Sequence, residues 1–320
     1  MLFGLLWLVL WTAAALAALA AFNLLLARLI ERLVPPIGHF VNVDGLRLHY
    51  LDTGEKPGQQ EPPLLFIHGW LGQMNHFSYA LAALFPERRV VMVDRPGCGY
   101  SQAPRLPTIA ANAAVIAAFM DRIGLRQPLV IGHSLGGAIA LALALDTRAK
   151  IAGLALIAPF THFLASPFYD LMARQGRASR WLSSWLLGPL LSVLRAASPS
   201  HPAFAPEPVP RQFWRRAGGL LGMRPDTLLT GAREISSQQR ELGAMQARYA
   251  SLSIPVSMLF GAGDRLLDAK TQGEAFCAVA PQAKLVVVPG GHCLPMTQPR
   301  DCENFIRAAL ARQQLETTCP

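Results

Sequence analysis

Charged residues are missing from the first part of the chain. Asp, Glu, Lys and Arg make up 15% of the 320 residues, yet none lies between Leu2 and Ala27. As a helix this apolar run would measure about 39 Å, enough to cross a hydrocarbon core of about 30 Å. No Lys or Arg precedes the run, and it continues past the Ala-Leu-Ala sites at 15–17 and 18–20, which argues against a cleaved signal peptide. We predict a transmembrane anchor with its flank over residues 1–34, with a cleaved signal as the alternative.

Basic residues flank this span on one side only. Arg28, Arg32 and Arg47 follow it and none precedes it. The positive-inside rule therefore places the rest of the chain on the cytoplasmic side. We expect a single-pass N-terminal anchor of the bacterial inner-membrane type, with the lipid bilayer as a partner.

Cysteine pairs with metal-ligand spacing are also missing. The chain has five cysteines, an odd number, at positions 98, 277, 293, 302 and 319. Without Cys-x-x-Cys or His-rich patterns a zinc site is excluded, and no metal is expected. Free thiols in a reducing compartment fit best, and a Cys277–Cys302 disulfide is the alternative for a periplasmic domain.

Lysine is absent from residues 161–250, although this segment is strongly basic. It holds eleven Arg against five acidic residues, in a chain of net charge +9 and pI near 9.8. This charge predicts either attraction to an anionic membrane surface or a solvated helical face. No nucleic-acid-binding motif accompanies it, so nucleic acid is not an expected partner.

Apolar strands alternate with helical patterns along most of the chain, and no internal repeat is present. This alternation predicts an α/β fold with a doubly wound, mostly parallel sheet. A hairpin at 40–51 precedes it, and from Thr161 the alternation stops for about ninety residues, which predicts a helical cap. The expected strands are 64–67, 90–93, 128–131, 151–158, 256–260 and 284–288, and the expected helices are 77–84, 109–123, 137–145 and 300–313. The expected parts are 35–160 (core), 161–250 (cap), 251–315 (core) and 316–320 (tail).

Gly132-x-Ser134-x-Gly136 lies between a predicted strand and a predicted helix. A strand that turns directly into a helix needs a sharp bend, and glycines on both sides of the bend leave room for it. The bend exposes the Ser134 hydroxyl at the positive end of the helix. The pattern predicts a nucleophilic serine.

A serine nucleophile needs a base, and the base needs an acid that orients it. His292 follows the last predicted strand through a Gly-Gly turn, where it can reach over the strand ends. Asp264 occupies the equivalent loop one strand earlier, and Asp268 is the alternative acid. Imidazole exchanges protons near neutral pH, as a general base must.

These motifs together resemble the α/β-hydrolase fold family, in its capped ester-hydrolase branch, from about Phe40 to Gln313. Five motifs carry this resemblance, in the order that is typical of the family: His68-Gly69-Trp70, Asp94-Arg95-Pro96-Gly97-x-Gly99-x-Ser101, Gly132-His133-Ser134-Leu135-Gly136-Gly137, Gly263-Asp264 and Gly291-His292.

The resemblance implies a catalytic triad of Ser134, His292 and Asp264. It also implies an oxyanion hole formed by the backbone N–H groups of Trp70 and Leu135. His68, Gly69, Gly132 and Gly136 would support the site, and His133 would be structural.

The reaction expected from this resemblance is hydrolysis of a small-molecule carboxylic ester, hydrophobic or lipid-like, without a cofactor. Serine at the centre of the Gly-x-Ser-x-Gly turn argues against the epoxide-hydrolase and dehalogenase relatives, whose pattern requires aspartate at that position. Hydrolysis of a carbon–carbon bond in a diketone-like substrate and a cofactor-free peroxidase activity are alternatives on the same scaffold.

Overall fold

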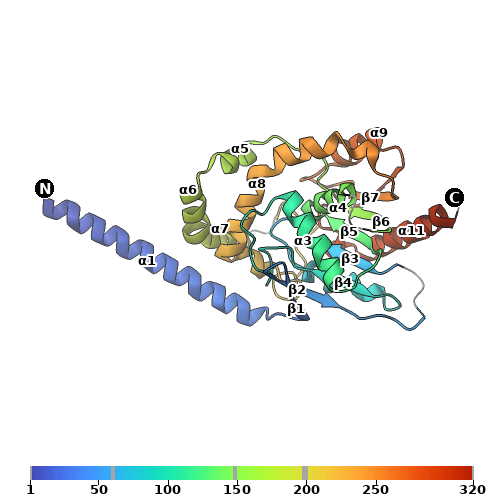
Figure 1. Ribbon diagram of the computed structural model, residues 1–320. Helices are drawn as coiled ribbons and strands as arrows, with labels where there is room; N and C mark the ends of the chain where they lie inside the picture. The colour runs from blue at the N-terminus through green and yellow to red at the C-terminus, as the bar shows by residue number, and fades with distance from the viewer. Residues whose placement is uncertain (1, 59–61, 147–149, 197–200, 319–320) are drawn as a thin grey trace.

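A long N-terminal helix projects from a layered body in which a central sheet lies between helices (Figure 1). This computed structural model describes residues 2–58, 62–146, 150–196 and 201–318. The N-terminal helix, α1 (Leu2–Leu33), has 32 residues, and its apolar stretch has a mean hydropathy of 2.2. By length and composition it could cross a membrane or serve as a signal sequence.

Eight strands form one sheet in the order β1-β2-β4-β3-β5-β6-β7-β8. They are β1 (His39–Val43), β2 (Leu46–Asp52), β3 (Leu64–Ile67), β4 (Val90–Val93), β5 (Leu129–His133), β6 (Gly153–Ile157), β7 (Val256–Gly261) and β8 (Ala283–Val288). The pairs β1–β2 and β2–β4 are antiparallel and all other neighbours are parallel. With β4 on one side of β3 and β5 on the other, the winding reverses there, so the predicted doubly wound, mostly parallel sheet is confirmed.

The inner strands are buried along their whole length, which explains their unbroken apolar sequences. Every residue of β3 to β7 is buried, as expected when helices cover both faces of a parallel sheet. On one face pack α3 (Ile109–Arg122) and α4 (Leu135–Leu145). On the other pack α2 (Asn75–Ser78), η1 (Ala82–Leu84) and α11 (Pro299–Thr318). The remaining core elements are η5 (Lys270–Glu274), α9 (Ala275–Val279) and α10 (Leu294–Thr297).

Two predicted helices differ clearly from the observed ones, namely the helix expected at 77–84 and the C-terminal helix expected at 300–313. The helix expected at 77–84 is divided into α2 and η1, although Phe77, Leu81 and Phe85 still share one buried face at helical spacing. The tail expected at 316–320 begins inside α11, which continues to Thr318. No Gly or Pro interrupts the sequence between Pro299 and Pro320, so nothing in it ends the helix at 315.

Helices lie above the carboxyl ends of the strands, in the segment where the strand alternation stops. These are α5 (Pro167–Arg174), α6 (Arg177–Leu182), η2 (Ser183–Leu187), α7 (Gly188–Ala196), η3 (Gly219–Met223), α8 (Pro225–Gln246) and η4 (Tyr249–Ser251). We call this segment the cap. Its longest helix, α8, begins with Pro225. Proline is favourable at this first position, because a backbone N–H there would have no hydrogen-bond partner within the helix.

The last third of α1 is not free but packs against the cap. The Nδ2 of Asn23 donates to the carbonyl oxygens of Trp185 at 2.6 Å and Leu186 at 3.0 Å. Farther along, Ile30 and Val34 are buried in a cluster with residues of η3. The sequence suggests a separate anchor and a separate cap, whereas the structure joins them.

One residue, Ser134, separates β5 from α4, and close backbone packing makes this tight turn fit. A Cβ at Gly132 would lie 2.6 Å from the carbonyl oxygen of Gly136. A Cβ at Gly136 would lie 2.1 Å from the carbonyl oxygen of Ile67, at the end of β3. Both distances are far below van der Waals contact, and the opposing atoms are backbone atoms that cannot turn aside. Glycine is therefore required at both positions.

Substituting Gly136→Ala should destabilise the protein by about 1–3 kcal/mol or more, because the new methyl group forces β3 and α4 apart. The measurement is urea or thermal unfolding of the full-length protein in a neutral detergent. Gly243→Ala is the matched control: it lies inside α8, and within the described part of the chain no neighbour outside its own helical turns comes within 4 Å of the new methyl group. Relief of glycine's helix penalty should make that variant more stable, by about 0.5–1 kcal/mol. Equal effects of the two substitutions would contradict the packing argument.

Candidate active site

Three residues predicted to be catalytic follow three strands of the same parallel sheet. Ser134 follows β5, Asp264 follows β7 and His292 follows β8. The last two loops are joined, because the N–H of Gly263 donates to the carbonyl oxygen of Gly290 at 2.7 Å. The carboxyl ends of parallel strands share one edge, where open α/β sheets bind their ligands.

His292 and Asp264 are in direct contact. The Nδ1 of His292 lies 2.8 Å from the Oδ2 of Asp264, and both side chains are almost completely buried. The other carboxylate oxygen accepts the backbone N–H groups of Leu266 and Leu267, at 2.8 and 3.0 Å. The carboxylate is thus fixed by three hydrogen bonds, and a proton on Nδ1 leaves Nε2 of the ring free to act as a base.

Asp268, the alternative acid, is engaged elsewhere. It is exposed, and its two oxygens accept from the N–H (2.9 Å) and the hydroxyl (2.5 Å) of Thr271. These bonds hold down the pKa of Asp268. The structure therefore pairs His292 with Asp264 and not with Asp268.

Ser134 lies at the tip of the turn, with φ 55° and ψ −121°, a conformation that non-glycine residues rarely adopt. Strain of this kind is typical of functional positions. A Cβ on Gly69 would be 3.0 Å from the Cβ of Ser134, so the loop after β3 runs directly beside the serine. The Ser134 hydroxyl is not seen hydrogen-bonded to His292 in the described part of the chain, and the triad of Ser134, His292 and Asp264 stays a prediction.

His133 links the serine turn to the histidine loop. Its Nε2 donates to the carbonyl oxygen of His292 at 3.0 Å, and the two rings are 4.9 Å apart. The residue before the serine thus touches the residue predicted to be its base. Burial, with His292 nearby, lowers the pKa of His133 to about 3, so this ring is neutral at physiological pH.

The predicted oxyanion-hole donors lie on two elements that meet at Ser134. Leu135 is the first residue of α4, where a backbone N–H has no partner within the helix. Trp70 follows Gly69, and its indole Nε1 donates to the carbonyl oxygen of Gly231 in α8 at 3.1 Å. The indole thereby ties this loop to the cap. The role of the two N–H groups stays a prediction.

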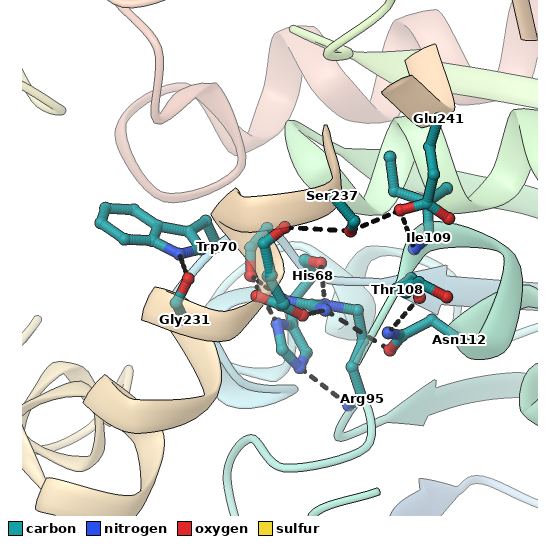
Figure 2. A network of polar contacts seen from close by, with 11 residues as sticks. His68, Trp70, Arg95, Thr108, Ile109, Asn112, Gly231, Ser237 and Glu241 are labelled. Carbon is teal, nitrogen blue, oxygen red and sulfur yellow. Dashed lines mark hydrogen bonds and ion pairs between the residues drawn. The ribbon is translucent and has the colours of Figure 1, made fainter. Parts of the chain in front are cut away.

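Figure 2 shows the polar network beneath this loop, centred on Arg95. His68 is completely buried; its Nε2 accepts the backbone N–H of Arg95 at 2.9 Å and its Nδ1 donates to the carbonyl oxygen of Gly69 at 2.9 Å. The guanidinium of Arg95 donates to the carbonyl oxygens of His68 and Gly69, at 3.0 and 3.1 Å. Burial and the Arg95 charge hold the pKa of His68 well below its usual value. His68 and Arg95 together fix the backbone beside Ser134.

Arg95 also forms a buried ion pair with Glu234 of α8. The exposed fractions of these side chains are 0% and 3%. A second link joins α8 to the core at the start of α3. The carboxylate of Glu241 accepts the N–H group of Ile109 at 3.1 Å (Figure 2) and that of Ala110 at 3.0 Å. Such a carboxylate is favourable at a helix N-terminus.

Sequence reasoning missed this pairing, since Arg95 belongs to a turn that is expected to be structural and Glu234 is one acidic residue of a basic cap. The only available signal was composition: Glu234 and Glu241 are two of the five acids among eleven arginines.

The buried cysteines do not behave as alternative nucleophiles. Cys98, Cys277, Cys293 and Cys302 are free, so the Cys277–Cys302 disulfide is not formed; Cys319 lies outside the described residues. Burial raises the pKa of Cys98 to about 12 and raises that of Cys293 as well, which keeps both thiols protonated. Among the residues that the structure describes, no group of three His, Cys, Asp or Glu side chains could hold a metal ion.

The depressed pKa of His133 predicts acid sensitivity. Between about pH 6.5 and pH 3 the unfolded chain binds a proton at this histidine and the folded chain does not, so stability is present above pH 6.5 and is lost as the pH falls. The loss is at most about 1.4 kcal/mol per pH unit from this group. His133→Gln can still donate to the carbonyl of His292 but cannot titrate, so its melting temperature should fall less steeply between pH 7 and pH 4.5. Parallel curves for the two proteins would contradict the assignment.

Comparison with known proteins gives a consistent family assignment. Residues 62–299 match the alpha/beta hydrolase fold family. The magnesium-chelatase 30 kDa subunit of Rhodobacter capsulatus is 30% identical over 263 residues, which is 76% of this chain and 84% of that protein. The dihydrolipoyllysine-residue acetyltransferase component of the acetoin cleaving system of Cupriavidus necator is 39% identical over 122 residues, 38% of this chain but only 31% of its own length.

A solved structure extends this similarity to nearly the whole chain. The crystal structure of a membrane phospholipase A, described as a novel bacterial virulence factor, superposes with a TM-score of 0.65 at 23% identity. The superposition covers 98% of this chain and 99% of the phospholipase chain. At this identity the likeness concerns the fold. The family match, the sheet order and the strand-to-helix turn agree, and the chain belongs to the alpha/beta hydrolase fold family.

Proposed function

We propose that this protein is a membrane-anchored serine hydrolase that cleaves carboxylic esters. The observation that carries the proposal is the buried His292–Asp264 pair, with Nδ1 and Oδ2 2.8 Å apart, in loops that touch the strained Ser134 turn through His133. A base with a fixed acid, close to a half-buried serine at the tip of a turn, is the arrangement that acyl transfer requires.

The proposed reaction has two halves. The Oγ of Ser134 attacks the ester carbonyl carbon while its proton passes to Nε2 of His292, and the resulting oxyanion accepts the N–H groups of Leu135 and Trp70. Collapse breaks the bond to the alcohol, which leaves with the proton from His292, and an acyl-Ser134 ester remains. Water then gives a proton to His292 while its oxygen attacks the acyl carbon. The bond between that carbon and Oγ breaks, the proton passes from His292 to Oγ, and the acid is released. Asp264 stabilises the imidazolium formed in each half.

A hydrophobic or lipid-like ester is the substrate class that the surroundings favour. The similar solved structure is that of a membrane phospholipase A, and the likeness reaches into α1 because it covers 98% of this chain. Large apolar side chains are exposed on the cap beside α1, including Leu187, Leu191 and Leu194. An ester that resides in a membrane would meet this face of the enzyme first.

Replacing Ser134 with Ala should abolish labelling by a fluorophosphonate probe and lower kcat for aryl esters by about 10⁴-fold or more, because the attacking oxygen is gone. Both readouts are made on full-length protein in neutral detergent, with esters of graded acyl length. Labelling that persists in the variant would place the nucleophile elsewhere.

Two aspartates supply the matched control for this experiment. Asp264→Asn should lower kcat by about 10⁴-fold, since the amide favours the wrong tautomer of His292. Asp268→Asn changes an exposed carboxylate that accepts hydrogen bonds from Thr271 and not from His292 in the described part of the chain, and its kcat should stay within about twofold of the wild type. A diketone assayed in parallel separates ester hydrolysis from carbon–carbon bond hydrolysis, and cleavage of the diketone alone would favour the second reaction.

The membrane anchor has a test of its own. We expect α1 to cross the bilayer and to stay attached, so the full-length protein should remain in membranes washed with alkaline carbonate, and its intact N-terminus should be found by mass spectrometry. Release into the wash, or a new N-terminus near residues 18–21, would instead indicate a peripheral protein or a cleaved signal sequence.

A further inference from the structure

A basic pocket lies at the point where α1 enters the body. It has a volume of about 390 Å³ and is lined by Leu33, Arg211, Gln212, Arg215 and Arg216. The volume falls within the range of roughly 300–1,000 Å³ that is typical of small-molecule sites. It belongs to neither the Ser134 turn nor the His292 loop. We call it the arginine pocket.

The positive charge of the arginine pocket is not balanced by acidic side chains. Within the described part of the chain, none of the ion pairs involves Arg211, Arg215 or Arg216. The acid nearest to Leu33 along α1, Glu31, pairs with Arg224 at 3.0 Å. Three guanidinium groups around one cavity repel one another, and an anion in the cavity would relieve that repulsion.

The three arginine side chains are exposed, but the segment that carries them is well packed. Phe213, between them in sequence, is buried against Phe204, with ring centroids 4.7 Å apart. Trp214 packs both on Phe213 and on the cluster that contains Ile30 of α1. The Nη1 of Arg216 donates to the Oε1 of Gln212 at 3.0 Å. The pocket therefore keeps a fixed position relative to the anchor.

That position corresponds to the headgroup layer of a bilayer. If Leu2–Ala27 spans the hydrocarbon core with tilt, Leu33 lies six residues beyond it, about 9 Å along the helix axis. Each headgroup layer is about 5–7 Å thick, and tilt shortens the distance along the membrane normal. Asn23, four residues before the end of the span, is bonded to η2, which carries the exposed Leu187 and leads into α7 with its exposed leucines, and this is where an interfacial helix would meet the acyl chains.

We propose that the arginine pocket binds the phosphate of an anionic phospholipid headgroup. The inference rests on the proposed membrane anchoring but not on the proposed ester hydrolysis. The headgroup phosphate would accept hydrogen bonds from the guanidinium groups, and its acyl chains would run along α1 toward the exposed leucines of the cap. Binding there fixes the tilt of the body on the membrane.

The experiment uses full-length protein in neutral detergent micelles. Short-chain phosphatidylglycerol is titrated into the protein, and native mass spectrometry gives the apparent Kd; phosphatidylcholine and inorganic phosphate are titrated in the same way. The test variant is R211Q/R215Q/R216Q. The matched control is R122Q/R126Q/K150Q, which removes the same charge from exposed positions near the amino ends of β5 and β6.

We expect the wild type to prefer phosphatidylglycerol to phosphatidylcholine. The test variant should lose about a hundredfold in affinity for phosphatidylglycerol, because it lacks three basic residues and each one near a membrane surface contributes about fivefold. The control variant should change less than twofold. R211K/R215K/R216K keeps the charge, so it should retain most of the affinity. If thermal melting shows that the glutamine variant is unfolded, the affinity of this lysine variant is the measurement that tests the proposal.

Three outcomes would overturn the proposal. Equal losses in the test and control variants would mean that only net charge matters. Equal affinity of the wild type for the two lipids would mean that no headgroup site exists. Displacement of the lipid by inorganic phosphate at similar concentration would make the pocket a site for the free ion.

Hydrolysis of a water-soluble ester by the same wild-type preparation separates this result from the proposed reaction. A protein that binds phosphatidylglycerol without cleaving the ester would contradict the hydrolase assignment alone. The converse result would contradict the arginine pocket alone.

Discussion

The close approach of α4 to the end of β3 is the constraint on which the rest of the site depends. Gly136 faces the carbonyl oxygen of Ile67 with no room for a side chain, and this contact sets the serine turn beside the loop that carries Gly69 and Trp70. Because Ser134 is confined between that loop and the end of β6, where its N–H donates to Ile157 and its carbonyl oxygen accepts from Phe160, its positive φ is maintained by packing on both sides. A looser fit would let the turn relax into an ordinary helix start and would withdraw the hydroxyl.

A buried ion pair also joins the cap to the loop beside Ser134. Arg95 holds two carbonyl oxygens of the loop beside Ser134 and the carboxylate of Glu234 in α8. Removing two opposite charges from water is costly, and the cost is offset only while the pair and its hydrogen bonds stay intact. Movement of α8 away from the core would leave Arg95 buried without its partner. Among the cap helices, α8 is therefore the one that these buried bonds tie to the core.

The sequence predicted features that depend on neighbours along the chain. The strands at 64–67 and 90–93 were predicted with their exact bounds, because an unbroken apolar run between turn residues is typical of a parallel strand that is buried on both faces. The proximity of Asp264 and His292 followed from two loops at the same sheet edge. The Arg95–Glu234 pair and the bond between Asn23 and the cap join residues 139 and 162 positions apart, and no local pattern indicates such contacts. The end of α11 was missed because helix ends without a Gly or Pro signal are set by fraying rather than by sequence.

Asn23 is a polar exception in an apolar run, and its contacts give it a structural role. The buried NH2 group of this amide needs acceptors, and the carbonyl oxygens of Trp185 and Leu186 supply them in a stretch where the π-helical η2 leaves its backbone accessible. A leucine there could slide or rotate against the cap, whereas the amide fixes one register. Together with Ile30, Val34 and the Glu31–Arg224 pair, it makes α1 continuous with the cap. In the proposed membrane-anchored arrangement, the tilt of α1 would set how the whole body, including the edge of the sheet that carries Ser134, faces the bilayer.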